Sequence, residues 1–78
     1  MDYRPIVEYI VKRLVDEPES VKVTTNIERR VIMIDVRVAP NDVGKIIGKN
    51  GRIINCLRHF VSALARRMHQ KALVRVVT

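Results

Sequence analysis

A chain of 78 residues and 9.0 kDa has room for one small domain, because at this length folding buries only about 60% of the unfolded surface. A composition of 47% hydrophobic and 29% charged residues is typical of a globular protein; it excludes a disordered chain and a large enzyme with a deep cleft, and no apolar run reaches the length of a membrane span. Lysine and arginine total 15 against 8 aspartate and glutamate, so the net charge of +7 favours a polyanionic partner.

The first half of the sequence predicts a helix followed by two strands. Apolar residues recur every three or four positions over residues 6–14, which predicts an amphipathic helix that Pro18 stops after Glu17. The period then changes to two, which predicts a strand over residues 21–26, a polar turn over residues 26–30 and a second strand over residues 32–38. In the second strand, Ile32, Ile34, Val36 and Val38 alternate with Met33, Asp35 and Arg37.

The second half predicts two helices and a last strand. Residues 40–47 form a short helix that Gly48 ends, and residues 72–77 form a β-branched strand. The resulting order, α-β-β-α-α-β, predicts a single α+β domain over residues 1–78, with a three-stranded sheet and helices packed on one face. Between the short helix and the last strand, the pattern predicts a long helix over residues 52–70, built on Ile53, Leu57, Phe60, Val61, Leu64 and Met68.

A Gly-x-x-Gly turn, Gly48-Lys49-Asn50-Gly51, forms the whole connection between the two predicted helices. Gly48 is expected to take the left-handed conformation that ends a helix, and Gly51 to let a backbone approach closely. Lys49 and Asn50 then lie on an exposed turn. Loop amides and the following helix N-terminus present partial positive charge there, so the turn suits a phosphodiester backbone.

Two further features of this segment bear on its function. Residues 44–50 superficially resemble a Walker phosphate loop, but the glycines enclose three residues instead of four, and Asn50 stands where Ser or Thr would bind magnesium. Neither nucleotide hydrolysis nor a small-molecule substrate is therefore predicted. Gly44 costs a helix about 1 kcal/mol relative to alanine, so either the sheet or a ligand is expected to pack closely against it.

The run from Pro40 to Arg52, Pro-x-Asp-Val-Gly-Lys-x-Ile-Gly-Lys-x-Gly-Arg, resembles the KH domain, and the element order resembles its type II form. Over the whole chain the sequence resembles the small bacterial KhpA-type RNA-binding proteins. The resemblance implies a groove for about four nucleotides of single-stranded RNA, with Val36 or Val38 from the strand in its wall. By position, the RNA-binding residues it implies are Val43, Gly44, Lys45, Ile47, Gly48, Lys49, Asn50, Gly51 and Arg52.

Other chemistry finds little support in the sequence. Cys56 and His59 lie three residues apart, but a tetrahedral metal site lacks further ligands nearby. No Ser/His/Asp or Cys/His set has catalytic spacing, so no enzyme, catalytic residue, metal or cofactor is predicted. The lone cysteine and the lack of a signal-peptide pattern predict a cytoplasmic protein without a membrane partner. The few aromatic residues, none near the glycine turn, predict weak base stacking.

Two functions remain open. The first is a non-enzymatic single-stranded RNA-binding protein that acts as an RNA chaperone or post-transcriptional regulator. The second is a protein-interaction module that forms a homodimer, or a heterodimer with another KH-containing protein, as the resemblance implies. The apolar arc of the long helix spans about 140°, wider than a sheet needs, so a margin is expected to be exposed and Ile54→Asp to favour the monomer. The candidate dimer surface comprises Ile54, Cys56, Phe60 and Ala63.

Overall fold

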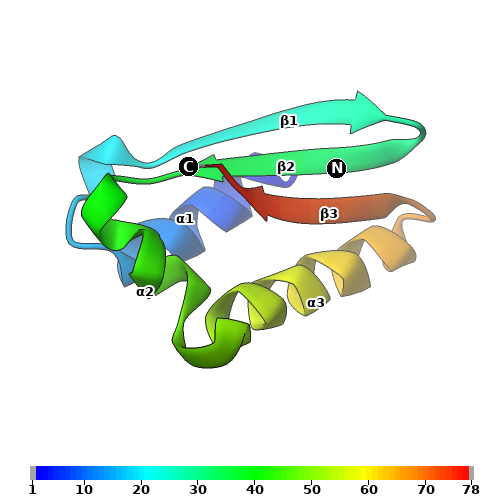
Figure 1. Cartoon of the computed structure of the whole chain (residues 1–78). Helices are drawn as coiled ribbons and strands as arrows, with labels where there is room; N and C mark the ends of the chain where they lie inside the picture. The colour runs from blue at the N-terminus through cyan, green and yellow to red at the C-terminus, as the bar shows by residue number, and fades with distance from the viewer. Residues whose placement is uncertain (1, 78) are drawn as a thin grey trace.

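The computed structural model describes residues 2–77 and arranges them in two layers, a sheet and a set of helices on one of its faces (Figure 1). The elements follow in the order α-β-β-α-α-β, which confirms the expected order. Short 3-10 turns lie at Pro18–Ser20, Pro40–Asp42 and Lys49–Gly51. The helices are α1 (Arg4–Leu14), α2 (Val43–Ile47) and α3 (Arg52–Arg67), and the strands are β1 (Lys22–Glu28), β2 (Val31–Arg37) and β3 (Lys71–Val76).

The strand β2 occupies the centre of the sheet, antiparallel to β1 and parallel to β3. Asp35 of β2 lies directly beside Arg75 of β3, and the Arg75 guanidinium donates to both carboxylate oxygens of Asp35 at 2.8 and 3.3 Å. Parallel strands need a crossover connection, which α2 and α3 form here. The glycine turn at residues 48–51 therefore lies in the middle of that crossover.

The turn between β1 and β2 is tighter than the sequence predicts. The expected polar loop over residues 26–30 is wrong, because β1 continues to Glu28 and pairs it with Val31. Arg29 and Arg30 alone form the connection, with φ values of 52° and 68°. Such two-residue hairpin turns match the twist of the strands but usually hold Asn-Gly. Because that signal is missing, the sequence pattern suggested a longer loop.

One hydrophobic core fills the space between the sheet and the helices. Met33 alternates with the core residues of β2 and is not among them, yet it is only 7% exposed, because it lies in the central strand between Asn26 and Leu73. The buried members of the core are Tyr3, Val7, Val11, Val23, Ile34, Val36, Ile46, Ile54, Leu57, Val61, Ala65 and Val74.

The long helix α3 turns a different side to the core from the one expected. Phe60 and Met68, predicted as core residues, are 42% and 48% exposed, whereas Ile54 and Ala65, predicted at the margin, are 6% and 1% exposed. A core-facing stripe needs only about 100° of a helix, so the wider apolar arc leaves one edge uncovered. The apolar periodicity of α3 does not by itself show which edge of the arc faces the core. The buried residues of α3 are Ile54, Leu57, Val61 and Ala65.

The end of α3 lies three residues before the expected one. His69 takes a left-handed φ of 56°, and the N–H of Gln70 donates to the carbonyl of Ala65 at 2.9 Å. This is the Schellman arrangement that ends many helices, with His69 where glycine is usual. The Tyr3 hydroxyl also donates a 2.6 Å hydrogen bond to Oε1 of Gln70. These bonds hold the connection between α3 and β3 in place.

Candidate nucleic-acid interface

The two glycines of the turn at residues 48–51 have the reverse of their expected roles. Gly48 has φ 75° and ψ 175°, and a Cβ placed on it would lie 2.6 Å from Cγ1 of Ile53. Gly51, at φ 74° and ψ 15°, takes the left-handed conformation, and its added Cβ would meet no atom nearer than 3.6 Å. The close approach is thus at Gly48, where the chain folds back onto the first turn of α3. Positive φ at both positions explains why this turn uses glycine twice.

The tip of the turn projects away from the core. Lys49 and Asn50 are exposed, and Asn50 takes φ 57° and ψ 26°, a left-handed conformation that asparagine tolerates better than most residues. Arg52, also exposed, begins α3 directly after the turn. Gly51 at the N-cap has no side chain that could cap the helix. The first N–H groups of α3 therefore present partial positive charge beside two full positive charges.

Lys45 does not contribute a free charge to this group. Its Nζ lies 2.9 Å from Oδ2 of Asp16 and 3.5 Å from Oδ1 of Asp42. The hydrogen bond to Asp16, followed by the weaker one to Asp42, raises the pKa of Lys45 above its ordinary value. Asp16 lies just after α1, far from Lys45 in sequence, so spacing could not reveal the pair. The expected phosphate contact at Lys45 would have to compete with these carboxylates.

Asp42, at the start of α2, is only 1% exposed and ties α2 to the end of α1. Burial by itself raises the pKa of the Asp42 carboxyl. Hydrogen bonds from the backbone N–H groups of Asp16 and Glu17, at 3.2 and 3.0 Å, and from Lys45 outweigh this effect, so the pKa lies below the ordinary value of 3.8. Asp42 therefore fixes the helix that precedes the glycine turn.

We expect Asp42→Asn to lower the melting temperature at neutral pH. The melting temperature of the variant should also depend less on pH in the acidic range. A carboxylate with a lowered pKa stabilises the fold fully above its unfolded pKa, and this contribution is lost as the pH falls through the lower folded pKa. The difference between parent and variant should therefore shrink below about pH 3.8. Thermal melts from pH 7 to pH 2 measure it. A difference that is the same at every pH would contradict the assignment.

An apolar groove lies beside the start of α2. It has a volume of about 440 Å³ and is lined by Arg37, Val38, Pro40, Val43 and Val77. The structure decides between the two strand candidates, because Val36 is fully buried in the core, whereas Val38 lies in the groove wall next to Val43. The strand β2 ends at Arg37, and Val38 beyond it packs only partly against the core and also lines the groove.

Gly44 and Ile47 lie on the exposed side of α2. Ile47 is 37% exposed, and it does not line the groove at Val43. Of the two neighbours expected for Gly44, the sheet is excluded, because a Cβ placed there would meet no described atom within 4 Å, and the ligand alternative stays a prediction. The missing side chain thus leaves bare helix backbone open between the groove wall and the glycine turn.

Arg58 is a residue near the edge of the sheet that the sequence reasoning did not select. Its Nε donates a 3.0 Å hydrogen bond to the carbonyl of Val74, on the edge of β3 that faces away from β2. One basic residue among several on α3 carries no distinguishing signal in the sequence. The bond joins α3 to the free edge of the sheet and leaves the guanidinium only partly exposed.

The candidate dimer surface is smaller than expected. Cys56, Phe60 and Ala63 are exposed. The assignment of Ile54 to this surface is wrong, because α3 turns Ile54 toward the core. An apolar groove of about 350 Å³ runs between α1 and α3 on the same side. Its lining residues are Ile10, Leu14, Arg52, Ile53, Cys56, Leu57 and Phe60.

Within residues 2–77, no group of three or more His, Cys, Asp or Glu side chains is close enough to hold a metal ion. No helix in the described part of the chain is both long and apolar enough to cross a membrane. The glycine turn, the groove at the start of α2 and the cations beside the turn form the candidate site.

A mixed three-stranded sheet, covered on one face by helices of which two are joined by a Gly-x-x-Gly turn, defines a type II KH domain. The chain belongs to the family described as KhpA/KhpB, KH domain, whose model matches residues 4–77.

Individual relatives agree with this assignment. The chain is 39% identical over 74 residues to RNA-binding protein KhpA of Clostridium perfringens, an alignment that covers 95% of this chain and 99% of the relative. It is also 39% identical over 72 residues to RNA-binding protein KhpA of Caldanaerobacter subterraneus, covering 92% and 96%. With the protein of that name from Streptomyces coelicolor it shares 45% over 60 residues, covering 77% and 76%. A search of the solved structures found no significant match.

Proposed function

We propose that this protein binds single-stranded RNA without enzymatic activity and serves as an RNA chaperone or post-transcriptional regulator. The observation that carries the proposal is the exposed Lys49-Asn50 tip, with positive φ glycines on either side and the N-terminus of α3 behind it. Relatives named RNA-binding protein KhpA support RNA as the polyanion.

The turn and the groove divide the binding between them. Lys49, Arg52 and the first N–H groups of α3 attract phosphates, while Val38 and Val43 offer an apolar wall to the bases. The bare backbone at Gly44 lets a nucleotide lie directly against α2 between the two. Bases can use such a wall only when they are unpaired, and the space suits a segment of about four nucleotides.

Weak stacking favours a chaperone that releases its RNA readily. Tyr3 is buried, and the Tyr9 ring faces the Arg13 guanidinium at 4.8 Å. Phe60 lies in the groove between α1 and α3, so none of the described aromatic rings lies in the groove beside α2. Stacking contributes about 1–3 kcal/mol per base where it occurs. Without it, we expect modest affinity and little sequence preference.

The proposal predicts a measurable salt dependence. Three cations surround the turn in the sequence, but the ion pairs of Lys45 leave Lys49 and Arg52 as the free ones. With a coefficient of about 0.7 per phosphate for single strands, the slope of log K against log salt should be about −1.4 for an oligonucleotide of about five nucleotides. Fluorescence anisotropy titrations at several salt concentrations measure this slope. A slope of zero would mean that these cations do not bind phosphate.

A second candidate function is self-association through α3, proposed from the groove between α1 and α3. Phe60 is 42% exposed and Cys56 is exposed beside it, although small domains usually bury such side chains. A second copy, or another KH-containing protein, would cover them and extend a core that is small by itself.

A further inference from the structure

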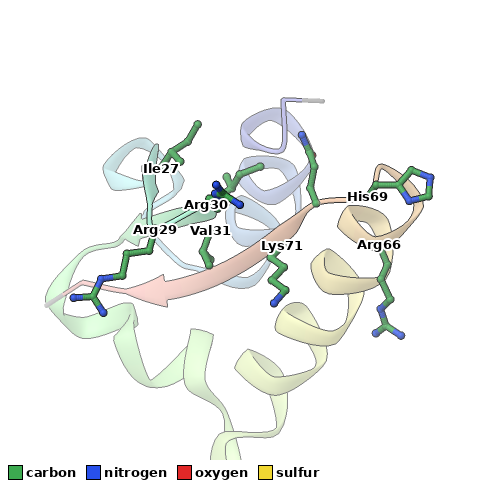
Figure 2. Close-up of a pocket in the computed structure, with 9 residues that line it drawn as sticks. Ile27, Arg29, Arg30, Val31, Arg66, His69 and Lys71 are labelled. Atoms are coloured by element: carbon green, nitrogen blue, oxygen red, sulfur yellow. The ribbon is translucent and has the colours of Figure 1, made fainter.

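A second positively charged cleft lies at the far end of α3 from the glycine turn. Its volume is about 840 Å³, and it lies between the β1–β2 hairpin and the junction of α3 with β3 (Figure 2). Four arginine or lysine side chains line it, together with one histidine, and none of the lining residues is acidic. We call it the hairpin-end cleft, lined by Ile27, Arg29, Arg30, Val31, Ile32, Arg66, His69, Gln70 and Lys71.

The cations of this cleft are not neutralised. Over residues 2–77, each ion pair within 4.0 Å uses a cation elsewhere, at Arg4, Lys12, Lys45 or Arg75. Even Glu28, the acid next to the hairpin turn, is bound by Arg75 at 3.1 Å. The hairpin-end cleft therefore holds four free arginine or lysine charges, whereas the glycine turn has two. Such a concentration of one sign favours a multiply charged anion.

The directions of the side chains distinguish between kinds of anion. Arg29 and Arg66 point away from each other on opposite sides of the cleft, and Lys71 lies between them (Figure 2). A single phosphate would need guanidinium groups that converge on one point. A fan of separate cations instead suits an extended chain of charges. Ile27, which is 77% exposed in the same cleft, adds an apolar surface that a base or ribose can cover.

The length of α3 sets the distance between the two basic regions. Its 16 residues span about 24 Å, with Arg52 at one end and Arg66 near the other. A stacked single strand advances about 3.4 Å per nucleotide, so about seven nucleotides are needed to cover this span. The four nucleotides in the groove cannot reach the hairpin-end cleft. An RNA of about 15 nucleotides can contact both regions.

We propose that the hairpin-end cleft binds phosphates of the same RNA beyond the segment held at the glycine turn. The inference rests on the proposed function and adds to it a longer footprint, in which the turn fixes the strand and the cleft holds its continuation. Because the added contacts are electrostatic, they should carry no base preference. A longer footprint of this kind would hold an RNA chain unpaired over more than the four nucleotides of the groove.

The test compares one triple variant with a control of equal charge. Arg29→Gln, Arg30→Gln and Arg66→Gln remove three cations of the cleft, whereas Arg4→Gln, Lys12→Gln and Arg13→Gln remove three from α1. Each protein is titrated with unstructured RNAs of about 5 and about 15 nucleotides at several salt concentrations, and its melting temperature is recorded.

We expect the parent to bind the longer RNA with the steeper salt slope. The cleft variant should reduce that slope by about 2 and weaken binding of the longer RNA by about 100-fold at 0.1 M salt, while its affinity for the shorter RNA and that of the control for both stay near the parent values. Equal loss in the cleft variant and the control, or equal parent slopes for both lengths, would overturn the inference. So would tighter binding of polyglutamate than of the longer RNA at the same ionic strength, since an acidic protein segment would then fit the cleft better.

Failure of this inference is distinguishable from failure of the proposed function. In the proposed function the shorter RNA is held at the glycine turn, and its binding is measured in the same series. If the shorter RNA binds and responds to substitution at Lys49 while the cleft variant matches the control, only the hairpin-end cleft is wrong. If the shorter RNA does not bind the parent, the proposed function has failed.

Discussion

The double variant Lys49→Asp and Asn50→Asp should lose RNA binding while keeping its fold. Both side chains are exposed at the tip of a turn whose conformation depends on the neighbouring glycines, and these remain unchanged. The substitutions remove one cation and place two carboxylates where phosphates are expected. Loss of the contact together with the new repulsion should weaken binding of a short oligonucleotide by at least about 100-fold at low salt. Anisotropy titration measures the loss, and a thermal melt checks the fold.

A matched control separates a local effect from a general change in charge. Arg4→Glu with Asn26→Asp lowers the net charge by the same amount, at exposed positions toward the end of the molecule away from the glycine turn, since Tyr3 bonds Gln70 beyond α3 and Asn26 pairs with Met33 near the hairpin. This control should bind short RNA within about threefold of the parent, because the Debye length of about 10 Å at 0.1 M salt screens distant charges. Parental affinity in a folded Lys49→Asp and Asn50→Asp protein would show that the glycine turn is not the binding site.

Sequence periodicity predicted the order of the elements because each one has a clear pattern and a clear end. The strands alternate with period two, the helices with three or four, and Gly48 follows directly after α2. Pro18 marks the end of the first helix less closely, because α1 ends at Leu14 and not at Glu17 as expected. The glycine turn was found for a related reason, since it is the whole connection between two helices. These features are local, so a single sequence contains them.

Features that depend on packing between distant segments were missed or reversed. The pairing of Lys45 with Asp16 joins the end of α1 to α2, and no spacing rule connects the two residues. The rotation of α3 follows from which stripe the sheet covers, a choice that an arc of apolar residues leaves open. The roles of Gly48 and Gly51 were exchanged because the close approach depends on where Ile53 lies. In each case the deciding contact is made only in the folded protein.

The net charge of the chain follows from its composition, but the positions at which the positive charges gather in the fold do not. A net charge of +7 favoured a polyanion, and the glycine turn was taken as its centre. In the structure the carboxylates of Asp16 and Asp42 bind Lys45, while the hairpin turn and the end of α3 bring together cations from segments far apart in sequence. The two-residue turn at Arg29 and Arg30 creates this second region, and it lacks the Asn-Gly signal by which hairpins are recognised.

With self-association through α3 as proposed, Phe60→Asp should shift the protein to a monomer without unfolding it. Phe60 is 42% exposed and lines the groove between α1 and α3, so a carboxylate there can remain hydrated in the monomer. In a pair of copies joined at this groove, the same carboxylate would be buried without a partner, at a cost of several kcal/mol. Sedimentation equilibrium should show the parent approaching twice 9.0 kDa as its concentration rises, and the variant staying near 9.0 kDa.

Ile54→Asp is the contrasting variant to Phe60→Asp, because Ile54 lies on the side of α3 that faces the core. Ile54 is 6% exposed inside the core, so the substitution places a charge among apolar side chains in the monomer itself. The cost, again several kcal/mol, is a large share of the roughly 5–15 kcal/mol that stabilises a small domain. Ile54→Asp should therefore unfold the chain, as circular dichroism would show, whereas Phe60→Asp keeps the parental spectrum. A folded monomer from Ile54→Asp would contradict the packing of α3. A parent that stays at 9.0 kDa at high concentration would contradict the homodimer.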